Sequence, residues 1–251
     1  MKIVVLLSGI DSLIAKKKIE IDYPDAEIVS VYYDYGQPFK DNDLASLPDD
    51  VEVRKFDLAP DLYPGGVSDV NGRNMAAITL SCQWYQPDMI VCGFLYDEQG
   101  SYKDDDIIFC NLMGRILQRI YNKPIKVTSP FFEMRATKSE AIEWALCNGF
   151  TIDDLTRTVS CMFVEEVGHQ CGTCFKCFTR YMAFLYNGID VYKQYQNHPF
   201  SKAENLNNVF DRVSNSDYIY TEAMRYFLKL SDEYDVAFAL SSRSINNYLK
   251  K

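Results

Sequence analysis

Four cysteines fall within 17 residues, in the pattern Cys161-x9-Cys171-Gly172-x-Cys174-x2-Cys177. The short spacings and the glycine let the backbone turn so that its amides approach the sulfurs. Four thiolates complete a closed tetrahedron, which leaves no position for a water molecule, so the metal supports structure rather than hydrolysis. The pattern therefore predicts one structural Zn²⁺ ion. Because zinc-binding peptides gain roughly 10–16 kcal/mol from such a site, it constrains the fold of this region strongly.

Two other interpretations of the four cysteines stay open, namely unligated buried thiols and an iron–sulfur cluster. The polar stretch 165–170 and Lys176 are unlike a protein core, which disfavours buried free thiols. The remaining cysteines lie singly in apolar surroundings, unlike the disulfide framework of a small secreted domain. They are Cys82, Cys92, Cys110 and Cys147. This distribution favours a reducing compartment, and we expect a cytoplasmic protein.

The overall composition excludes several classes of protein. A chain of 251 residues is long enough to bury a full hydrophobic core. No apolar run approaches the roughly 18 residues that a membrane span needs, and the apolar start 3–7 is too short for a signal peptide. The net charge of −9 would repel phosphate backbones, which disfavours nucleic acid as a general partner.

Short β-branched runs alternate with segments of helical apolar spacing through the first 150 residues. This alternation predicts a doubly wound α/β fold with a parallel sheet of about five strands, Rossmann-like in its organisation. The expected strands are 2–7, 27–33, 51–56, 88–92 and 125–128. The expected helices are 12–19, 74–85, 107–121 and 137–147, the last with Thr137 as its N-cap and Glu140 completing a capping box. Ligands of such folds bind beyond the carboxyl ends of the strands.

We expect three regions along the chain. Residues 1–157 form the nucleotide-binding α/β domain, and residues 158–186 form the zinc-binding segment. Residues 187–251 lack strand signals and carry helical apolar spacing, so we expect a helical extension packed on the same unit. This extension suggests a partner protein, a homodimer interface or a macromolecular substrate.

The loop Ser8-Gly9-Ile10-Asp11-Ser12 follows the first expected strand and opens the first helix. Free backbone N–H groups and the helix dipole favour an anion at this position. The chain contains neither a Walker-type phosphate loop nor a dinucleotide fingerprint. The loop is thus a candidate phosphate site, although a plain strand-to-helix turn has the same outline.

Several segments resemble one known family in the same order along the chain. Residues 8–12 are similar to the S-G-G-x-D-S loop of PP-loop ATP pyrophosphatases, with one glycine missing. Residues 33–37 (YDYGQ) look like the F-D-Y-G-Q segment of the 7-cyano-7-deazaguanine synthase (QueC) family, and residues 71–74 resemble its P-G-R-N turn. Residues 158–161 match its T-x-S-C, and the cysteines follow at the family's position. The resemblance covers about residues 1–185.

The resemblance implies a reaction and its residues. Family members adenylate the carboxylate of 7-carboxy-7-deazaguanine with ATP and Mg²⁺, then convert it with ammonia to an amide and a nitrile. It implies that Ser8, Gly9, Ile10, Asp11 and Ser12 bind ATP. It implies catalytic roles for Asp11, Ser12 and Lys138, with Lys138 neutralising phosphate charge. It places Tyr35, Gln37, Arg73, Asn74 and Asp97 at the deazaguanine acid.

Alternatives to this reaction stay open. The shortened loop, Leu95 in place of the family's Asn, and a segment after Gln37 with little room for a helix all touch the expected site. One alternative is a QueC-like ligase of an antiviral gene cluster that joins the acyl group to an amine of a partner protein. Another is a binding module that has lost catalysis. A tRNA-thiolating enzyme is disfavoured by the negative charge and the compact cysteine spacing.

Overall fold

The computed structural model describes residues 1–37, 39–56, 72–99, 103–161 and 170–199. It divides the chain into two compact units, Met1–Thr158 and Val159–Lys251, which are taken separately below. Of the expected helical extension, only residues 187–199 are described. The segments 203–213, 220–230 and 234–248, whose apolar spacing predicts helices, lie outside the described residues. The three regions expected from the sequence stay a prediction.

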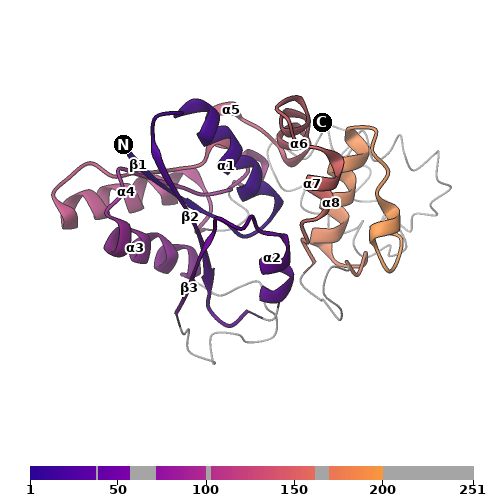
Figure 1. Ribbon diagram of the computed structural model, residues 1–251, viewed down its shortest axis with the longest axis horizontal. Coiled ribbons are helices and arrows are strands. Elements are labelled where there is room, and N and C mark those ends of the chain that lie inside the picture. Colours follow the sequence, from indigo (N-terminus) through magenta and orange to yellow (C-terminus); the bar gives the residue numbers. More distant parts are fainter. Residues whose placement is uncertain (38, 57–71, 100–102, 162–169, 200–251) are drawn as a thin grey trace, which may run out of the picture. The chain divides into compact units, whose positions relative to one another are not determined.

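The first unit contains a five-stranded parallel sheet, in the order β3-β2-β1-β4-β5 (Figure 1). The strands are β1 (Lys2–Leu6), β2 (Glu27–Asp34), β3 (Glu52–Lys55), β4 (Met89–Val91) and β5 (Lys126–Thr128). The chain adds β2 and β3 on one side of β1, then returns to place β4 and β5 on the other. The doubly wound parallel sheet is confirmed, and its topological switch point lies between β1 and β4.

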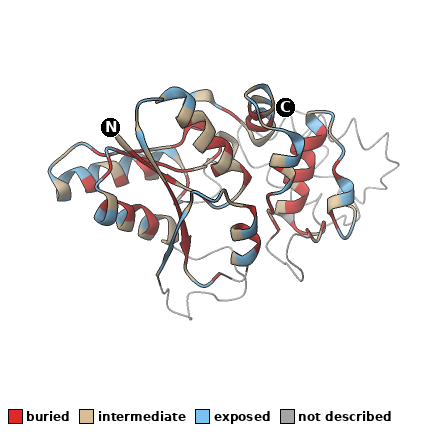
Figure 2. Ribbon diagram, viewed as in Figure 1, coloured by how far each residue is buried: buried red, intermediate tan, exposed pale blue. Residues whose placement is uncertain are grey.

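Helices cover both faces of the sheet. On one face, α3 (Arg73–Tyr85) and α4 (Ile107–Tyr121) pack over Val4, Val31 and Ile90. On the other, α1 (Ile10–Asp22) contacts α5 (Pro130–Met134) and α6 (Lys138–Cys147). The central strand β1 is buried through its middle three residues because both layers meet it (Figure 2). The apolar run at the N-terminus is therefore the buried strand that its composition predicts.

The helix α6 begins as its sequence predicts. The Glu140 amide donates to the Thr137 hydroxyl (3.3 Å), and the Glu140 carboxylate accepts from the Thr137 amide (2.7 Å). This capping box satisfies two backbone donors that the first turn would leave without a helical partner. It also fixes the direction in which Lys138, the first helical residue, leaves the backbone.

The segment between β2 and β3 differs from the expectation. A seven-residue helix, α2 (Lys40–Ser46), fits where the sequence suggested little room. Asp43 in its first turn accepts a hydrogen bond from the buried Tyr32 hydroxyl (3.0 Å), which ties the helix to β2. Acidic residues also favour the first turn of a helix. Helix α1 begins two residues earlier and ends three residues later than expected, and β3 is one residue shorter at each end. The five-residue helix α5 was not expected.

The second unit is described over residues 159–161 and 170–199. Its helix α8 (Phe175–Tyr186) begins at the cysteine segment. Arg180 of α8 is fully buried, donates to the Ser160 hydroxyl (3.2 Å), and lies over the ring of Phe184. In the first unit, α7 (Ile152–Thr156) is the last helix. Among the described residues, no helix is long and apolar enough to cross a membrane.

Candidate functional site

The loop after β1 is closed around the side chain of Ser12. The Ser12 hydroxyl oxygen accepts from the amides of Ser8 (2.8 Å) and Gly9 (3.1 Å) and donates to the Gly9 carbonyl (2.9 Å). The first helical bond of α1 runs from the Leu13 amide to the Gly9 carbonyl (3.0 Å). The N–H groups of residues 10–12 therefore precede the helical ladder, where an anion gains both donors and the helix dipole.

Gly93, after β4, lies against the first turn of α1. A Cβ atom at this position would lie 2.5 Å from the Ser12 nitrogen and 2.6 Å from the Ser12 Cα. Both are backbone atoms, so only glycine fits without displacing the loop. The switch point thus brings together the loops that follow β1 and β4.

The segment after Gly93 is itself fixed from two sides. The Ser129 hydroxyl donates to the Phe94 carbonyl (2.7 Å), and the Tyr96 amide donates to the Ala136 carbonyl (3.1 Å). The short 3-10 helix η2 (Tyr96–Glu98) follows and carries Asp97. These bonds position an acidic pair, Asp97 and Glu98, beside the first turn of α1.

Lys138 joins α6 to the loop of α1. Its ammonium lies 2.5 Å from the Asp11 Oδ2, and both side chains are largely buried. Burial favours a lower pKa for Lys138, but the negative charges of Asp11, Glu98 and Asp97 outweigh it, and the pKa lies above its ordinary value. Lys138 is therefore a fixed cation at the mouth of the candidate phosphate loop. Asp11 Oδ1 is buried and makes no hydrogen bond to the described residues.

Asp97 has the most perturbed carboxyl group near the loop. Burial, together with the charge of Glu98, raises the pKa of Asp97 to about 7, although Lys138 opposes the rise. Its Oδ1 is buried without a hydrogen-bond partner among the described residues. The Asp97 carboxyl group therefore changes its charge near neutral pH.

The residues expected at the deazaguanine acid separate into two roles. Arg73, at the start of α3, donates to the Tyr35 hydroxyl (3.4 Å), and Phe56 packs beside the Tyr35 ring. Gln37 instead points inward and is 2% exposed. Its amide nitrogen donates to the Tyr32 hydroxyl and the Tyr33 carbonyl, and its amide oxygen accepts from the Tyr35 amide. Gln37 therefore shapes the turn that presents Tyr35.

Asn74 also bonds to the backbone. Its side chain donates to the Asp104 carbonyl (3.0 Å), which ties the start of α3 to the segment before α4. The structure thus brings together Asp11 with Lys138, and Tyr35 with Arg73, at the carboxyl edge of the sheet. Phe56 and Glu98 also lie beside these residues, although the motifs of the sequence do not include them. The aromatic residue at the end of a strand and the second acid after Gly93 are the signals that point to them.

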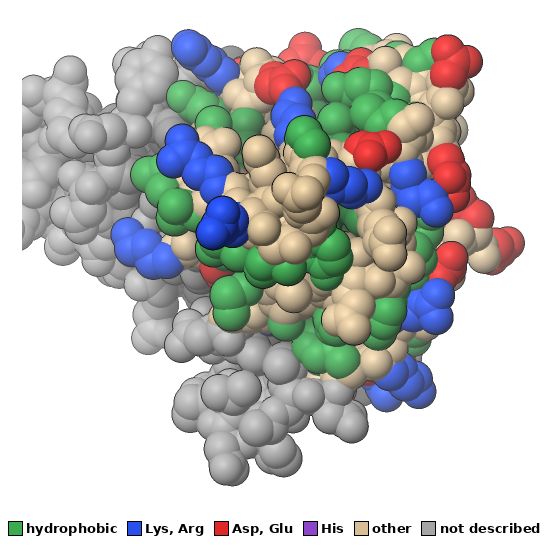
Figure 3. All heavy atoms as spheres, turned by 90° about the vertical axis from the view of Figure 1, so that its left-hand side faces the viewer, with side chains coloured by type: hydrophobic (Ala, Val, Ile, Leu, Met, Phe, Trp, Pro, Cys, Tyr) green, Lys and Arg blue, Asp and Glu red, His purple; other side chains and the backbone are tan. Residues whose placement is uncertain are grey.

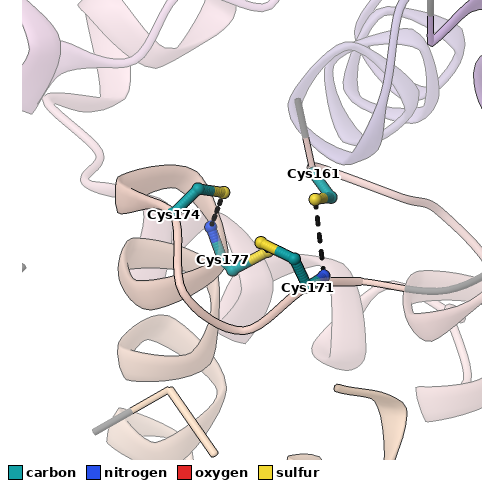
Figure 4. A group of neighbouring side chains, drawn as sticks. All are labelled: Cys161, Cys171, Cys174 and Cys177. Carbon is teal, nitrogen blue, oxygen red and sulfur yellow. Dashed lines mark hydrogen bonds between the residues drawn. The ribbon is translucent and has the colours of Figure 1, made fainter. Parts of the chain in front are cut away.

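The four cysteines of the second unit converge on one point (Figure 4). Their Sγ atoms lie within 4.8 Å of one another, and Cys171 and Cys177 are 3.9 Å apart. A tetrahedron with metal–sulfur bonds of about 2.3 Å has edges of about 3.8 Å, so a single ion fits. A four-iron cluster would hold the sulfurs farther apart because several iron and sulfide atoms lie between them.

Backbone amides support the sulfurs. The amides of Cys171, Thr173 and Cys177 donate to the sulfurs of Cys161, Cys171 and Cys174 at 3.3–3.4 Å. Without a cation, the neighbouring Cys174 sulfur and burial raise the pKa of Cys161 to about 12. The thiols therefore become thiolates together with a metal, whose charge offsets theirs.

Gly172 makes the turn between the cysteines possible. Its φ of +74° lies in the left-handed region, and a Cβ atom there would lie 1.7 Å from the Asn197 carbonyl oxygen. The Asn197 side chain in turn donates to the Cys171 carbonyl (3.0 Å). Residues 195–197 thus brace the cysteine turn from outside.

The fold and the two sites define a parallel α/β protein with an anion-type loop at its switch point and a metal-binding cysteine segment. The family model described as "Queuosine biosynthesis protein QueC" matches residues 46–188. This range is more than half of the chain, so the chain belongs to the QueC family.

Among solved structures, the chain is similar to a U34-tRNA thiolase, NcsA, from Methanococcus maripaludis with its [4Fe-4S] cluster, with a TM-score of 0.40 and 16% identity. The match covers 61% of this chain and 58% of that chain, so the chain spans less than two thirds of that protein's length. No curated protein sequence matches the chain.

Gly93→Ala should destabilise the first unit. The added methyl group meets the Ser12 backbone, and overpacking of this kind costs about 1–3 kcal/mol. We expect a melting temperature several degrees lower, measured by differential scanning calorimetry. Gly9→Ala is the matched control because its new Cβ atom has nothing within 4 Å and should leave the melting temperature unchanged. Equal effects of both changes would contradict the close contact at Gly93.

Asp97→Asn should change how stability depends on pH. Because the folded-state pKa of about 7 lies above the ordinary value, the folded protein keeps a proton that the unfolded chain releases. The free energy of unfolding should therefore fall as the pH rises from about 4 to 7, by at most about 1.4 kcal/mol per pH unit. The Asn variant should lack this decrease. Urea unfolding of both proteins between pH 5 and 8 measures the difference. The control Asp25→Asn removes an exposed carboxylate. If its unfolding free energy changes with pH in the same way as that of Asp97→Asn, the raised pKa of Asp97 is contradicted.

Proposed function

We propose that this chain is a QueC-like ATP-dependent ligase that adenylates the carboxylate of 7-carboxy-7-deazaguanine and transfers the acyl group to an amine. The observation that carries the proposal is the ion pair of Lys138 and Asp11 at the mouth of the Ser8–Ser12 loop. It provides a buried cation beside backbone donors, where a polyphosphate would develop charge. Family membership supplies the reaction class, and the substrate is part of the proposal.

The reaction needs no nucleophilic side chain. A carboxylate oxygen of the acid attacks the α-phosphorus of ATP, and pyrophosphate leaves with the electron pair of the broken bond. The amine nitrogen then attacks the acyl carbon and releases a proton to solvent, and AMP leaves with the electron pair of the broken carbon–oxygen bond. Since the substrates supply every reacting atom, the protein contributes positioning and charge stabilisation.

Each residue has a proposed part in this reaction. Ser8, Gly9, Ile10, Asp11 and Ser12 form the loop for the phosphates. Lys138 stabilises the charge that builds on the phosphates as pyrophosphate leaves. Mg²⁺ accompanies ATP and offsets further phosphate charge. Tyr35, Arg73 and Asp97 lie at the nucleobase or its carboxylate, where a guanidinium can bind a carboxylate through two bonds. Gln37 and Asn74 support these side chains.

The decisive experiment follows the products. Zinc-loaded protein is incubated with ATP, Mg²⁺ and 7-carboxy-7-deazaguanine, with and without ammonium, and AMP, pyrophosphate and the base are measured by mass spectrometry. We expect AMP, pyrophosphate and an amide or nitrile. Pyrophosphate and an acyl adenylate that ammonium does not convert to the amide would favour an amine of a partner protein as acceptor. A folded protein that forms neither pyrophosphate nor AMP would overturn the ligase and leave a binding module.

Single substitutions distinguish a role of Lys138 and the loop in adenylation from a general effect of losing a lysine. Lys138→Gln should lower adenylation by about 10²–10³-fold, the usual loss when a preorganised charge-stabilising group is removed. Ser8→Ala and Asp11→Asn test the loop directly. Lys126→Gln is the matched control, since this exposed lysine pairs with the exposed Glu133 (2.9 Å) on the same unit. Equal rates for Lys138→Gln and Lys126→Gln would remove Lys138 from the proposed site.

We also propose that the metal at the four cysteines is Zn²⁺ with a structural role. Elemental analysis should find about one zinc per chain, and the protein should lack the visible absorption of an iron–sulfur cluster. Cys177→Ser should release zinc and expose the second unit to proteolysis, because binding free energy there is folding free energy. Cys147→Ser, at an exposed cysteine outside the segment, should retain the metal. Stoichiometric iron with strong visible absorption would contradict zinc.

A further inference from the structure

A positive charge is buried in the second unit. Arg180 of α8 is 0% exposed and is the largest fully buried side chain among the described residues. A guanidinium stays protonated at every ordinary pH, and charged side chains are almost never fully buried unless an opposite charge compensates them. The proposed reaction gives this residue no part. Its burial therefore indicates negative charge nearby.

Arg180 lies on the same face of α8 as two of the four cysteines. Cys174 caps α8, Cys177 follows three residues later, and Arg180 follows three residues after that. Figure 4 shows the two cysteines at the start of the helix. Residues three apart are neighbours on a helix surface, and the Cα–Cβ bond of each helical residue tilts toward the helix N-terminus. The Arg180 side chain therefore leaves the helix in the direction of the metal ligands.

The hydrogen bonds of Arg180 lead to the other two cysteines. Its Nη1 donates to the Ser160 hydroxyl (3.2 Å), and Ser160 directly precedes Cys161. The Ser160 amide donates to the Gln170 side-chain oxygen (3.2 Å), and Gln170 directly precedes Cys171. Ser160 is the serine of the T-x-S-C segment, to which the proposed reaction gives no role. The guanidinium is thus linked to every stretch of chain that carries a metal ligand.

The buried Tyr195 also lies close to both Arg180 and the sulfurs. Its ring is 8% exposed and packs edge-on against the ring of Tyr181, with 5.7 Å between the ring centroids. Burial raises the pKa of Tyr195, and the charge of Arg180 opposes the rise. The sulfurs of Cys177 and Cys174 raise the same pKa further. One hydroxyl therefore lies within electrostatic reach of the guanidinium and of two metal ligands.

The metal centre carries the negative charge that Arg180 is placed to offset. Four thiolates and one divalent cation together carry a net charge of about −2. Cys161, Cys174 and Cys177 are at most 6% exposed, so water offsets little of this charge. Backbone amides and the N-terminus of α8 supply only partial positive charges. Arg180 adds a full one.

We propose that Arg180 is a positioning residue of the metal centre, whose guanidinium offsets the charge of the metal–thiolate group and holds the Cys161 segment in place through Ser160. Metal binding and the burial of Arg180 then stabilise each other. Without the metal the thiols are neutral, and the buried guanidinium loses its counter-charge. This proposal rests on the proposed Zn²⁺ at the four cysteines and is independent of the ligase reaction.

Competition with a chromophoric chelator on the full chain measures the affinity for Zn²⁺. Arg180→Gln removes the charge and keeps an amide that can donate to Ser160. Its dissociation constant should rise about 10–100-fold, the usual loss when a residue that supports metal ligands is changed. Arg180→Lys keeps the charge but loses the planar group that lies 5.2 Å from the centre of the Phe184 ring. It should bind Zn²⁺ about 10-fold or more tightly than Arg180→Gln.

Two exposed cations provide matched controls. Lys193→Gln removes a positive charge from the same unit, and Arg119→Gln makes the same substitution on α4 of the first unit. Figure 3 views the side on which α4 lies in Figure 1 and shows basic side chains at the surface. Both variants should bind Zn²⁺ like wild type, because solvent already screens an exposed charge.

The outcomes separate charge from packing and folding. A visible spectrum of bound Co²⁺ that is the same in Arg180→Gln and wild type would show intact tetrahedral thiolate ligation, so weaker binding then reports charge. Equal affinity of Arg180→Gln and wild type overturns the proposal, and so does a lysine variant that binds as weakly as the glutamine variant. If Arg180→Gln does not fold, Arg180→Lys decides, since charge predicts retained Zn²⁺ and packing predicts its loss. A wild-type chain that binds no Zn²⁺ overturns this proposal together with the zinc site and leaves the ligase to its own assay.

Discussion

The contact between Gly93 and the first turn of α1 joins the two halves of the sheet at their switch point. The backbone after β4 lies so close to the Ser12 nitrogen that no side chain fits between them. Because this contact fixes where β4 ends relative to β1, it also fixes η2 and the acids that η2 carries. The Gly93 contact therefore positions the Ser8–Ser12 loop and Asp97 relative to each other, whereas Lys138 reaches the loop through its ion pair with Asp11.

The second unit depends on a comparable contact. Gly172 brings the chain against Asn197 while it turns between the cysteines. In the first unit a glycine positions a helix N-terminus, and in the second a glycine allows backbone amides to reach sulfur. Backbone geometry therefore shapes both sites, and a methyl group added at either glycine would clash with neighbouring backbone atoms. A site built this way costs little reorganisation when its ligand binds.

The sequence predicted the layers of the fold better than the orientation of its polar side chains. Alternating apolar periodicity and capping residues identified the sheet and placed the start of α6, because burial and local bonding determine both. Gln37 shows why the site is harder. Its motif suggests a ligand contact, yet its side-chain amide is hydrogen-bonded to the Tyr32 hydroxyl and to two backbone groups. Which partner a polar side chain bonds depends on the residues that fold beside it, and motif spacing does not reveal those residues.

The charges at the loop explain how an acidic chain could admit a polyphosphate. Three carboxyl groups, of Asp11, Asp97 and Glu98, act on the single ammonium of Lys138. With all of them ionised, the cluster would repel phosphate, so a bound polyphosphate requires compensation. Protonation of Asp97 near neutral pH removes one negative charge, and Mg²⁺ on the polyphosphate offsets more. In the proposed reaction, Lys138 would exchange its bond to Asp11 for one to a phosphate oxygen, so the ion pair would hold the ammonium in place until the substrate binds.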